Sequence, residues 1–307
     1  MNNSYKLQAI GFKARDIGSG NLKLEAWSLR LGARRRRALG VTLVEMVVVI
    51  AITGIIATVV AVFIRRPVEG YVDAARRAAL TDIADTALRR ITRDLRTAVP
   101  NSTRVTTAAG VSYIEFLETR GGGRYRAEME SGGGGNPLIF NKADATFDVI
   151  GPMPAELNAG YFIVVYNVTS DPTITEGNAY SGDNRANYSS SAGQTITLNP
   201  AFQFPFPSPG SRFQVVRGAV TYACNPATQE LRRYWGYAIN NTQLIATDPR
   251  FAGATAALLA SDVTDCSFSY TTSGASQQTG VVTMMLQIEQ AGERIRLFQQ
   301  AHVSNVP

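Results

Sequence analysis

Hydrophobic residues run without a charge over one long stretch near the start of the chain. From Met46 to Ile64 there are nineteen residues without a charged side chain, close to the roughly 20 that a helix needs to cross the hydrocarbon core of a membrane. The pattern predicts one membrane-spanning helix over residues 41–64. Glu45 is the one charged residue inside it.

Beyond this span the pattern changes to apolar residues three or four positions apart, with charged residues between them. The apolar set is Val68, Val72, Ala75, Ala79, Ile83, Ala87, Ile91, Leu95 and Val99. This spacing predicts an amphipathic helix that ends before Pro100. Together the two segments predict one helix over about 41–99, loosened at Gly54 and kinked at Pro67. Its outer half is expected to pack against a sheet of the same chain.

Short alternating segments from Val111 onward predict a β-rich domain. The expected strands are 111–117, 124–130, 161–168, 195–198, 212–224, 230–239, 266–271, 281–290 and 294–302. The last two flank Ala291-Gly292-Glu293, which predicts a hairpin turn. The glycine clusters 121–123 and 132–135 and the polar tract 170–194 are expected to be loops. About 200 residues of this kind suffice for one sizeable core, so the predicted fold class is α+β.

The charge of the chain is unevenly distributed. The whole sequence has 30 Lys and Arg against 24 Asp and Glu. Residues 1–40 hold nine of the basic residues but only Asp16 and Glu25 of the acidic ones, which leaves 21 basic and 22 acidic residues after Gly40. The basic excess therefore gives no reason to expect a nucleic-acid partner. Arg34, Arg35, Arg36 and Arg37 beside the span instead predict a cytoplasmic N-terminal side and an exported C-terminal side.

The position of the small residue separates this span from a secretory signal peptide. A signal peptide has its small-residue cleavage site after the apolar run, whereas here Arg65, Arg66 and Pro67 follow the run and Gly40 precedes it. Gly40, Val41 and Glu45 resemble the processing motif of the type IV prepilin (pilin and pseudopilin) superfamily. The resemblance implies that prepilin peptidase cuts between Gly40 and Val41 and N-methylates Val41, which stands where the family usually has Phe or Met. Glu45 matches the glutamate at the fifth position of the mature proteins.

The resemblance also implies an organisation and a location. Residues 1–40 would be a cytoplasmic leader, 41–64 the transmembrane and assembly half of the helix, 65–100 its amphipathic half, and 101–307 a periplasmic head, together a lollipop-like shape. A carboxylate is costly inside a membrane and is usually retained for a partner. For Glu45 the expected partner is the N-terminal amine of a neighbouring subunit. The other implied partners are major and minor pilins and an inner-membrane assembly platform.

Looser similarity in the rest of the chain indicates one subgroup of this superfamily. The helix end Arg93-Asp94-Leu95-Arg96 and the segments Tyr222-Ala223-Cys224 and Cys266-Ser267-Phe268-Ser269-Tyr270 are most similar to the MshO group of minor pilins from mannose-sensitive haemagglutinin (MSHA) pili. The J-type pseudopilins of type II secretion are the nearest alternative. A second hypothesis is a membrane-tethered periplasmic binding or adhesive domain, which would have no use for a processing site or for Glu45.

The reactive side chains favour a structural protein over an enzyme. Cys224 and Cys266 are the two cysteines of the chain, and their exported position predicts a disulfide rather than two buried thiols. His302 is the single histidine, so zinc ligands and the base for a Ser or Cys nucleophile are not in evidence. We therefore expect no catalytic residues, no bound metal and no cofactor.

Two further segments have alternative interpretations. Asp171, Glu176, Asp183 and Asn184 could gather calcium, but they lack EF-hand spacing, and a solvated loop is favoured. The aromatic and proline cluster between Phe202 and Pro209 could be a docking surface, although an irregular edge of the core is favoured because apolar clusters are usually buried.

Overall fold

A computed structural model describes residues 40–246, 248–272 and 278–307 of the chain. Residues up to Ala61 and residues 62–307 form two units, and the helix α1, Leu43–Leu95, contributes to both. The helix is unbroken at Gly54 and at Pro67, where the sequence predicted loosening and a kink. It ends four residues earlier than predicted, and Ala98 then forms an isolated bridge with Glu118.

One face of the last four turns of α1 is buried. Its members are spaced three or four residues apart or adjacent, and they are Leu80, Ala84, Ala87, Leu88, Ile91 and Leu95. The predicted apolar stripe is therefore buried near the C-terminal end of the helix, as expected, but is exposed in the turns before it. Val68 and Val72 are 55% and 43% exposed, and Ile83 is exposed as well. The described contacts between α1 and the strands begin with the ion pair of Arg77 and Glu293 and the burial of Leu80. Val68 and Val72 lie before the part of the helix that the β domain covers.

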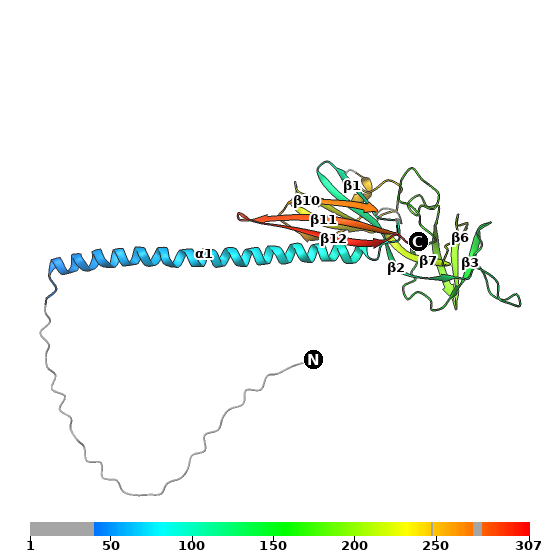
Figure 1. Ribbon diagram of the computed structural model, residues 1–307, viewed down its shortest axis with the longest axis horizontal. Helices are drawn as coiled ribbons and strands as arrows, with labels where there is room; N and C mark the ends of the chain where they lie inside the picture. Colours follow the sequence, from blue (N-terminus) through cyan, green and yellow to red (C-terminus); the bar gives the residue numbers. More distant parts are fainter. Residues whose placement is uncertain (1–39, 247, 273–277) are drawn as a thin grey trace, which may run out of the picture. The chain divides into compact units, whose positions relative to one another are not determined.

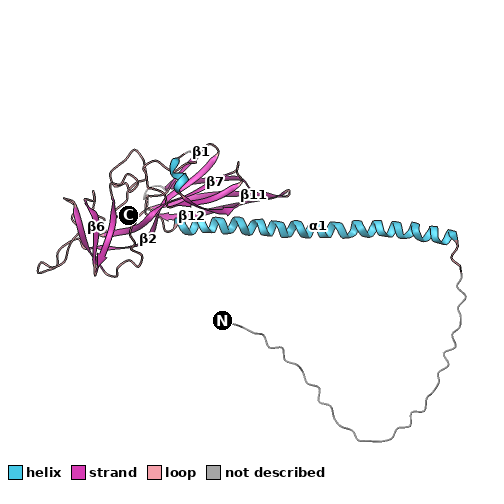
Figure 2. Ribbon diagram, turned by 180° about the vertical axis from the view of Figure 1, so that it is seen from behind, coloured by secondary structure: helices cyan, strands magenta, loops and turns pink. Residues whose placement is uncertain are grey.

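Apart from α1 and the short helix η1, Pro249–Gly253, the described part of the second unit consists of strands and loops (Figure 2). The strands are β1 (Arg104–Ala108), β2 (Val111–Tyr125), β3 (Asp144–Ile150), β4 (Phe162–Val164), β5 (Arg185–Ala192), β6 (Thr195–Phe202), β7 (Arg212–Asn225), β8 (Glu230–Trp235), β9 (Thr255–Ala260), β10 (Val263–Thr272), β11 (Thr279–Gln290) and β12 (Glu293–Ser304). They form a nine-stranded sheet in the order β1-β2-β3-β6-β5-β4-β7-β8-β9 and a three-stranded sheet in the order β10-β11-β12.

Two large apolar cores organise this unit, and smaller clusters lie beside them. The first lies between the last turns of α1 and both sheets, and its sheet residues come from β2, β7 to β9 and β10 to β12. Figure 1 shows the three-stranded sheet lying along the C-terminal part of α1. The second core lies inside a ring of strands. β2 pairs with both β3 and β7, so the strands β2, β3, β6, β5, β4 and β7 close into this ring. The ring surrounds a separate apolar cluster that includes Phe147, Phe204 and Phe213. The α+β class and the packing of the helix on a large β domain are confirmed.

The glycine triplet 121–123 is not the loop that the sequence predicted. It lies inside β2, where Gly122 and Gly123 pair with Gln214 and Phe213 of β7. A Cβ on Gly122 would come within 2.7 Å of the Phe213 carbonyl oxygen, and one on Gly123 within 2.8 Å of the Phe213 ring. Glycine therefore permits a close approach of two strands here. The predicted separate strand 124–130 is wrong beyond residue 125.

The sequence also missed several short strands. β1, β3 and β9 lie outside the predicted segments, and β5 lies within the polar tract expected to be a loop. β5 has the sequence RANYSSSA and is held between β4 and β6. Backbone pairing with two neighbours outweighs its low intrinsic strand preference.

Candidate functional site

The first residues of α1 form a hydrogen-bonded cap. The backbone N–H of Glu45 donates to Thr42 Oγ1 at 3.2 Å, and the N–H of Met46 donates to the Thr42 carbonyl oxygen at 3.2 Å. Thr42 is therefore the N-cap residue, and Glu45 occupies the third helical position, the arrangement of a capping box. Sequence reasoning overlooked this role of Thr42, although the spacing Thr42-x-x-Glu45 is its sequence signature.

The two residues before the cap are outside the helix. Gly40 and Val41 have no regular secondary structure, and both are exposed. A Cβ on Gly40 would meet no atom within 4 Å. The peptide bond between them is thus presented as accessible, non-helical chain immediately before a capped helix. A peptidase needs a segment of this kind, because a bond inside a helix would have to be unwound before it could enter an active site.

Glu45 lies in the first turn of α1 and is exposed. A carboxylate there is favoured by the partial positive charge of the helix N-terminus. With a rise of about 1.5 Å per residue, it is about 6 Å along the axis from Val41. An amine created at Val41 would therefore lie near a carboxylate of the same chain.

Every large apolar side chain from Val41 to Ile64 is exposed. The stretch meets the length and composition expected of a membrane-crossing helix, and none of its most apolar window is buried inside the protein. Two hydroxyl groups inside it are satisfied within the helix: Thr53 Oγ1 donates to the Val49 carbonyl at 2.7 Å, and Thr58 Oγ1 donates to the Gly54 carbonyl at 2.8 Å. The surface of residues 46–64 is thus compatible with lipid or with other apolar helices, because both of its threonine hydroxyls donate to the backbone.

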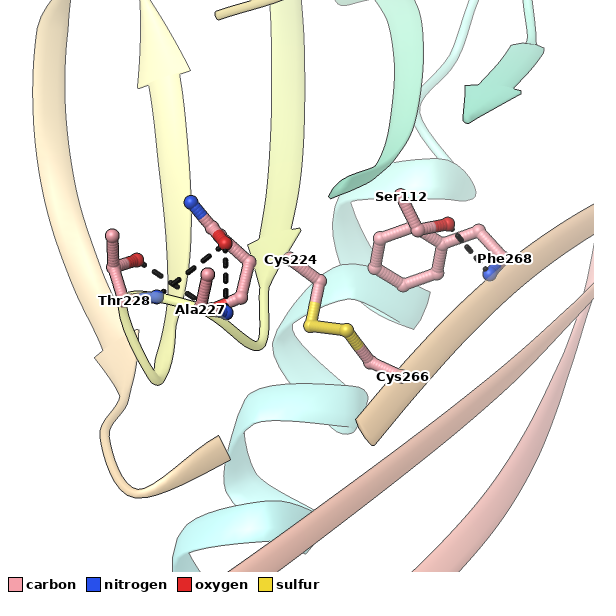
Figure 3. The surroundings of a disulfide bond; sticks show 7 residues. Ser112, Cys224, Ala227, Thr228, Cys266 and Phe268 are labelled. Atoms are coloured by element: carbon pink, nitrogen blue, oxygen red, sulfur yellow. Dashed lines mark hydrogen bonds between the residues drawn. A yellow bond between two sulfur atoms is a disulfide. The ribbon is translucent and has the colours of Figure 1, made fainter. Parts of the chain in front are cut away.

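The remaining predicted site residues fall elsewhere. Arg34, Arg35, Arg36 and Arg37 lie outside the described residues. Cys224 of β7 and Cys266 of β10 are joined in a disulfide, as the sequence predicted. Figure 3 shows the bond linking the two sheets beside α1, near the hydrogen bond that the Phe268 N–H donates to Ser112 Oγ at 3.0 Å. The disulfide therefore stabilises the arrangement of both sheets around the buried face of the helix.

The other candidates have structural surroundings. His302 is an exposed residue of β12. Asp171 Oδ1 accepts hydrogen bonds from the N–H and hydroxyl groups of Thr173, and Asp183 Oδ2 accepts one from the Gly177 N–H. No group of three metal-ligating side chains occurs among residues 40–246, 248–272 and 278–307. In the aromatic and proline segment Phe204 is fully buried, as an edge of the core would be.

One comparison with known proteins matches the helix start described above. The family model of the prokaryotic N-terminal methylation motif matches residues 35–61. This match supports a type IV pilin-like protein. It covers Gly40, Val41, Thr42 and Glu45 together with most of the apolar run. No curated protein and no solved structure matches the chain.

A type IV pilin-like motif has consequences for the segment it covers. It implies processing by prepilin peptidase and assembly with other pilins, and the family is structural rather than enzymatic. Together with the single apolar helix found among the described residues, it fits a single-pass membrane anchor.

Proposed function

We propose that the protein is a minor pilin or pseudopilin of an MSHA-type pilus, cut after Gly40 and inserted into a helical filament or its tip complex. The observation that carries the proposal is the position of the Gly40–Val41 bond. It stands exposed and non-helical directly before the Thr42 cap, inside the segment matched by the methylation motif. A plain membrane tether has no need of this arrangement.

Before assembly the protein would lie in the inner membrane. Arg34, Arg35, Arg36 and Arg37 would keep the N-terminal side in the cytoplasm, and residues 65–307 would face the periplasm. The disulfide between Cys224 and Cys266 agrees with an oxidising compartment for the head. The inner-membrane assembly platform and neighbouring major and minor pilins are the proposed partners.

The choice of an MSHA minor pilin rests on segments that lie together in the structure. Asp94, from the Arg93-Asp94-Leu95-Arg96 helix end, accepts a hydrogen bond from the Tyr222 hydroxyl at 2.7 Å. Cys224, two residues further along β7, is bonded to Cys266. The loosely similar segments thus form one contact region, which supports treating them as one feature. A J-type pseudopilin of type II secretion remains the alternative.

In the assembled filament the proposed role of Glu45 is to pair with the N-terminal amine of a neighbouring subunit. Val68, Tyr71 and Val72 extend the exposed apolar surface of α1 beyond the span, and such surface is usually covered by a partner. An ion pair that forms away from water is worth much more than one at a surface, so Glu45 would select subunits that have been cut. Its capping position suggests a second role, and the experiment must separate the two.

The separating variants are Glu45→Gln and Glu45→Val. Glutamine can serve in a capping box but has no charge, whereas valine can do neither. If the charge is what assembly needs, both variants are cut normally and neither enters sheared filaments. Asp82→Asn, a change at an exposed carboxylate of the same helix, should assemble like the wild type. Assembly of Glu45→Gln at the wild-type level would refute the charge-pairing role.

A further inference from the structure

A groove lined by arginine side chains runs between the last turns of α1 and the strands β2, β7, β8 and β9. Its central cavity has a volume of about 670 Å³. A cavity of about 410 Å³ shares Arg90, Arg93, Leu258 and Leu259 with it, and one of about 270 Å³ shares Glu118, Arg217 and Trp235. The three cavities are therefore neighbours along this groove, and the central one has the size of a ligand site.

The groove concentrates positive charge in a part of the chain that is nearly neutral. Its basic lining residues are Arg89, Arg90, Arg93, Arg120, Arg217 and Arg233, and its acidic ones are Asp94 and Glu118. Residues 41–307 as a whole have 21 basic and 22 acidic residues. Six of those basic residues thus face one groove with two acids. Clefts lined by one sign of charge attract ligands of the opposite sign.

Arg233 bridges both acids, and two further arginines of the groove are already paired. Arg233 Nε donates to Asp94 Oδ2 at 2.9 Å, and its Nη2 donates to Glu118 Oε1 at 3.2 Å. Arg90 Nε lies 3.2 Å from Asp94 Oδ1, and Arg89 Nε lies 2.6 Å from Asp85 Oδ2. Arg120 and Arg217 reach Glu118 at longer distances, 3.4 and 3.8 Å, and Arg120 also lies 3.9 Å from Glu156. Arg93 is exposed and forms no ion pair with any residue that the structure describes. The guanidinium groups left most available to a ligand are therefore those of Arg93, Arg120 and Arg217.

Apolar side chains line the groove together with these arginines. Leu258 is 50% exposed, Leu259 lines two of the cavities, and Phe162 and Ile239 line the third. Trp235 offers little stacking surface for a sugar or a base, since the Arg233 guanidinium lies 4.9 Å from its ring centroid. Arginine forks match carboxylates in a bidentate way. We propose that the groove binds an extended acidic peptide that carries both carboxylate and apolar side chains.

The probe for this site is a fluorescein-labelled eight-residue peptide that alternates glutamate with leucine. Fluorescence anisotropy is measured with the full-length protein purified in detergent. The peptide should bind, more weakly as salt is added, and a peptide that alternates lysine with leucine should not bind. Arg93→Glu and Arg120→Glu should each weaken binding about tenfold or more, which corresponds to one rim contact.

The matched control is Lys142→Glu, the same charge reversal at an exposed residue outside the groove. It should leave binding unchanged. The proposal is overturned if Lys142→Glu weakens binding as much as Arg93→Glu, or if the lysine and glutamate peptides bind equally. It is also overturned if inorganic phosphate, hyaluronate or single-stranded DNA displaces the peptide at lower concentrations than unlabelled peptide does. None of these outcomes depends on the assembly role proposed above.

Discussion

Asp94 in the last turns of α1 accepts a hydrogen bond from Arg233 of β8 at 2.9 Å, and their side chains are 9% and 8% exposed. The Tyr222 hydroxyl donates to the same carboxylate oxygen. A charged pair at this depth is tolerated because each partner compensates the other. The end of the helix is thus attached to the sheet by a buried polar cluster as well as by the apolar core.

Asp94→Ala should destabilise the head strongly. It leaves Arg233 buried with Glu118 as its remaining carboxylate partner, and loss of one partner from a buried pair costs about 3 to 5 kcal/mol. The control is Asp85→Ala, whose partner Arg89 is 74% exposed, with an expected cost of about 0.3 to 0.5 kcal/mol. Denaturant unfolding followed by tryptophan fluorescence measures both. Equal losses in the free energy of unfolding would show that the buried Asp94 cluster stabilises the head no more than an exposed ion pair does.

The buried tyrosines should make the head sensitive to alkali. Burial raises the pKa of Tyr180 and Tyr237 well above the ordinary value, and burial followed by the negative charge of Asp94 raises the pKa of Tyr222. The folded state therefore keeps protons that the unfolded chain loses near pH 10. This contribution to stability is complete below about pH 10 and is lost as the pH rises towards the folded pKa values.

Phenolate absorbance measures this effect. Above about pH 10 the native protein should ionise fewer tyrosines than the denatured protein, and the rest should ionise together on unfolding. Asp94→Asn should lower the pKa of Tyr222, because it removes the neighbouring negative charge. Full ionisation of the native protein in one step near pH 10 would contradict the prediction.

The disulfide should contribute substantially to stability. Cys224 and Cys266 are 42 residues apart, and closing a loop of that length is worth about 4 kcal/mol in the chain-entropy model. Cys224→Ser should lower the free energy of unfolding by up to that amount. A reductant should destabilise the wild type and leave Cys224→Ser unaffected. If reductant lowered the stability of the variant as well, its effect would not come from this bond.

Local patterns predicted the membrane span, the acidic residue inside it and the processing motif, because each depends on neighbouring residues alone. The cap of Thr42 on Glu45 is equally local and could have been recognised. The buried face of α1 was predicted correctly at Ala87, Ile91 and Leu95 but wrongly at Val68 and Val72. Periodicity shows that a helix is amphipathic, whereas the point at which a domain begins to cover it depends on tertiary structure.

The head was less predictable for the same reason. The glycine triplet 121–123 has the composition of a loop, and its role in β2 follows from the approach of Phe213 on another strand. β5 is Ser-rich and is a strand because two strands flank it. Arg93, Arg120 and Arg217 are far apart in sequence, and their gathering along one groove follows from the pairing of β2 with β7 and from the docking of α1.

Processing after Gly40 is the central claim, and it predicts the behaviour of two glycine variants. Gly40→Leu should remain uncut when it is produced with prepilin peptidase, because the residue before the scissile bond is the motif's small one. Gly54→Leu, which changes a glycine with no neighbour within 4 Å inside the span, should be cut normally. Denaturing gels distinguish the two outcomes, because the cut protein migrates at a lower mass than the uncut precursor.

The most direct measurement is intact and N-terminal mass spectrometry of the wild-type protein made with the peptidase. The account predicts a mature chain that begins at Val41, with a methyl group on its amine and the bond between Cys224 and Cys266 intact. A mature protein that retains the segment before Gly40, or one cut after the apolar run near Ile64, would contradict it.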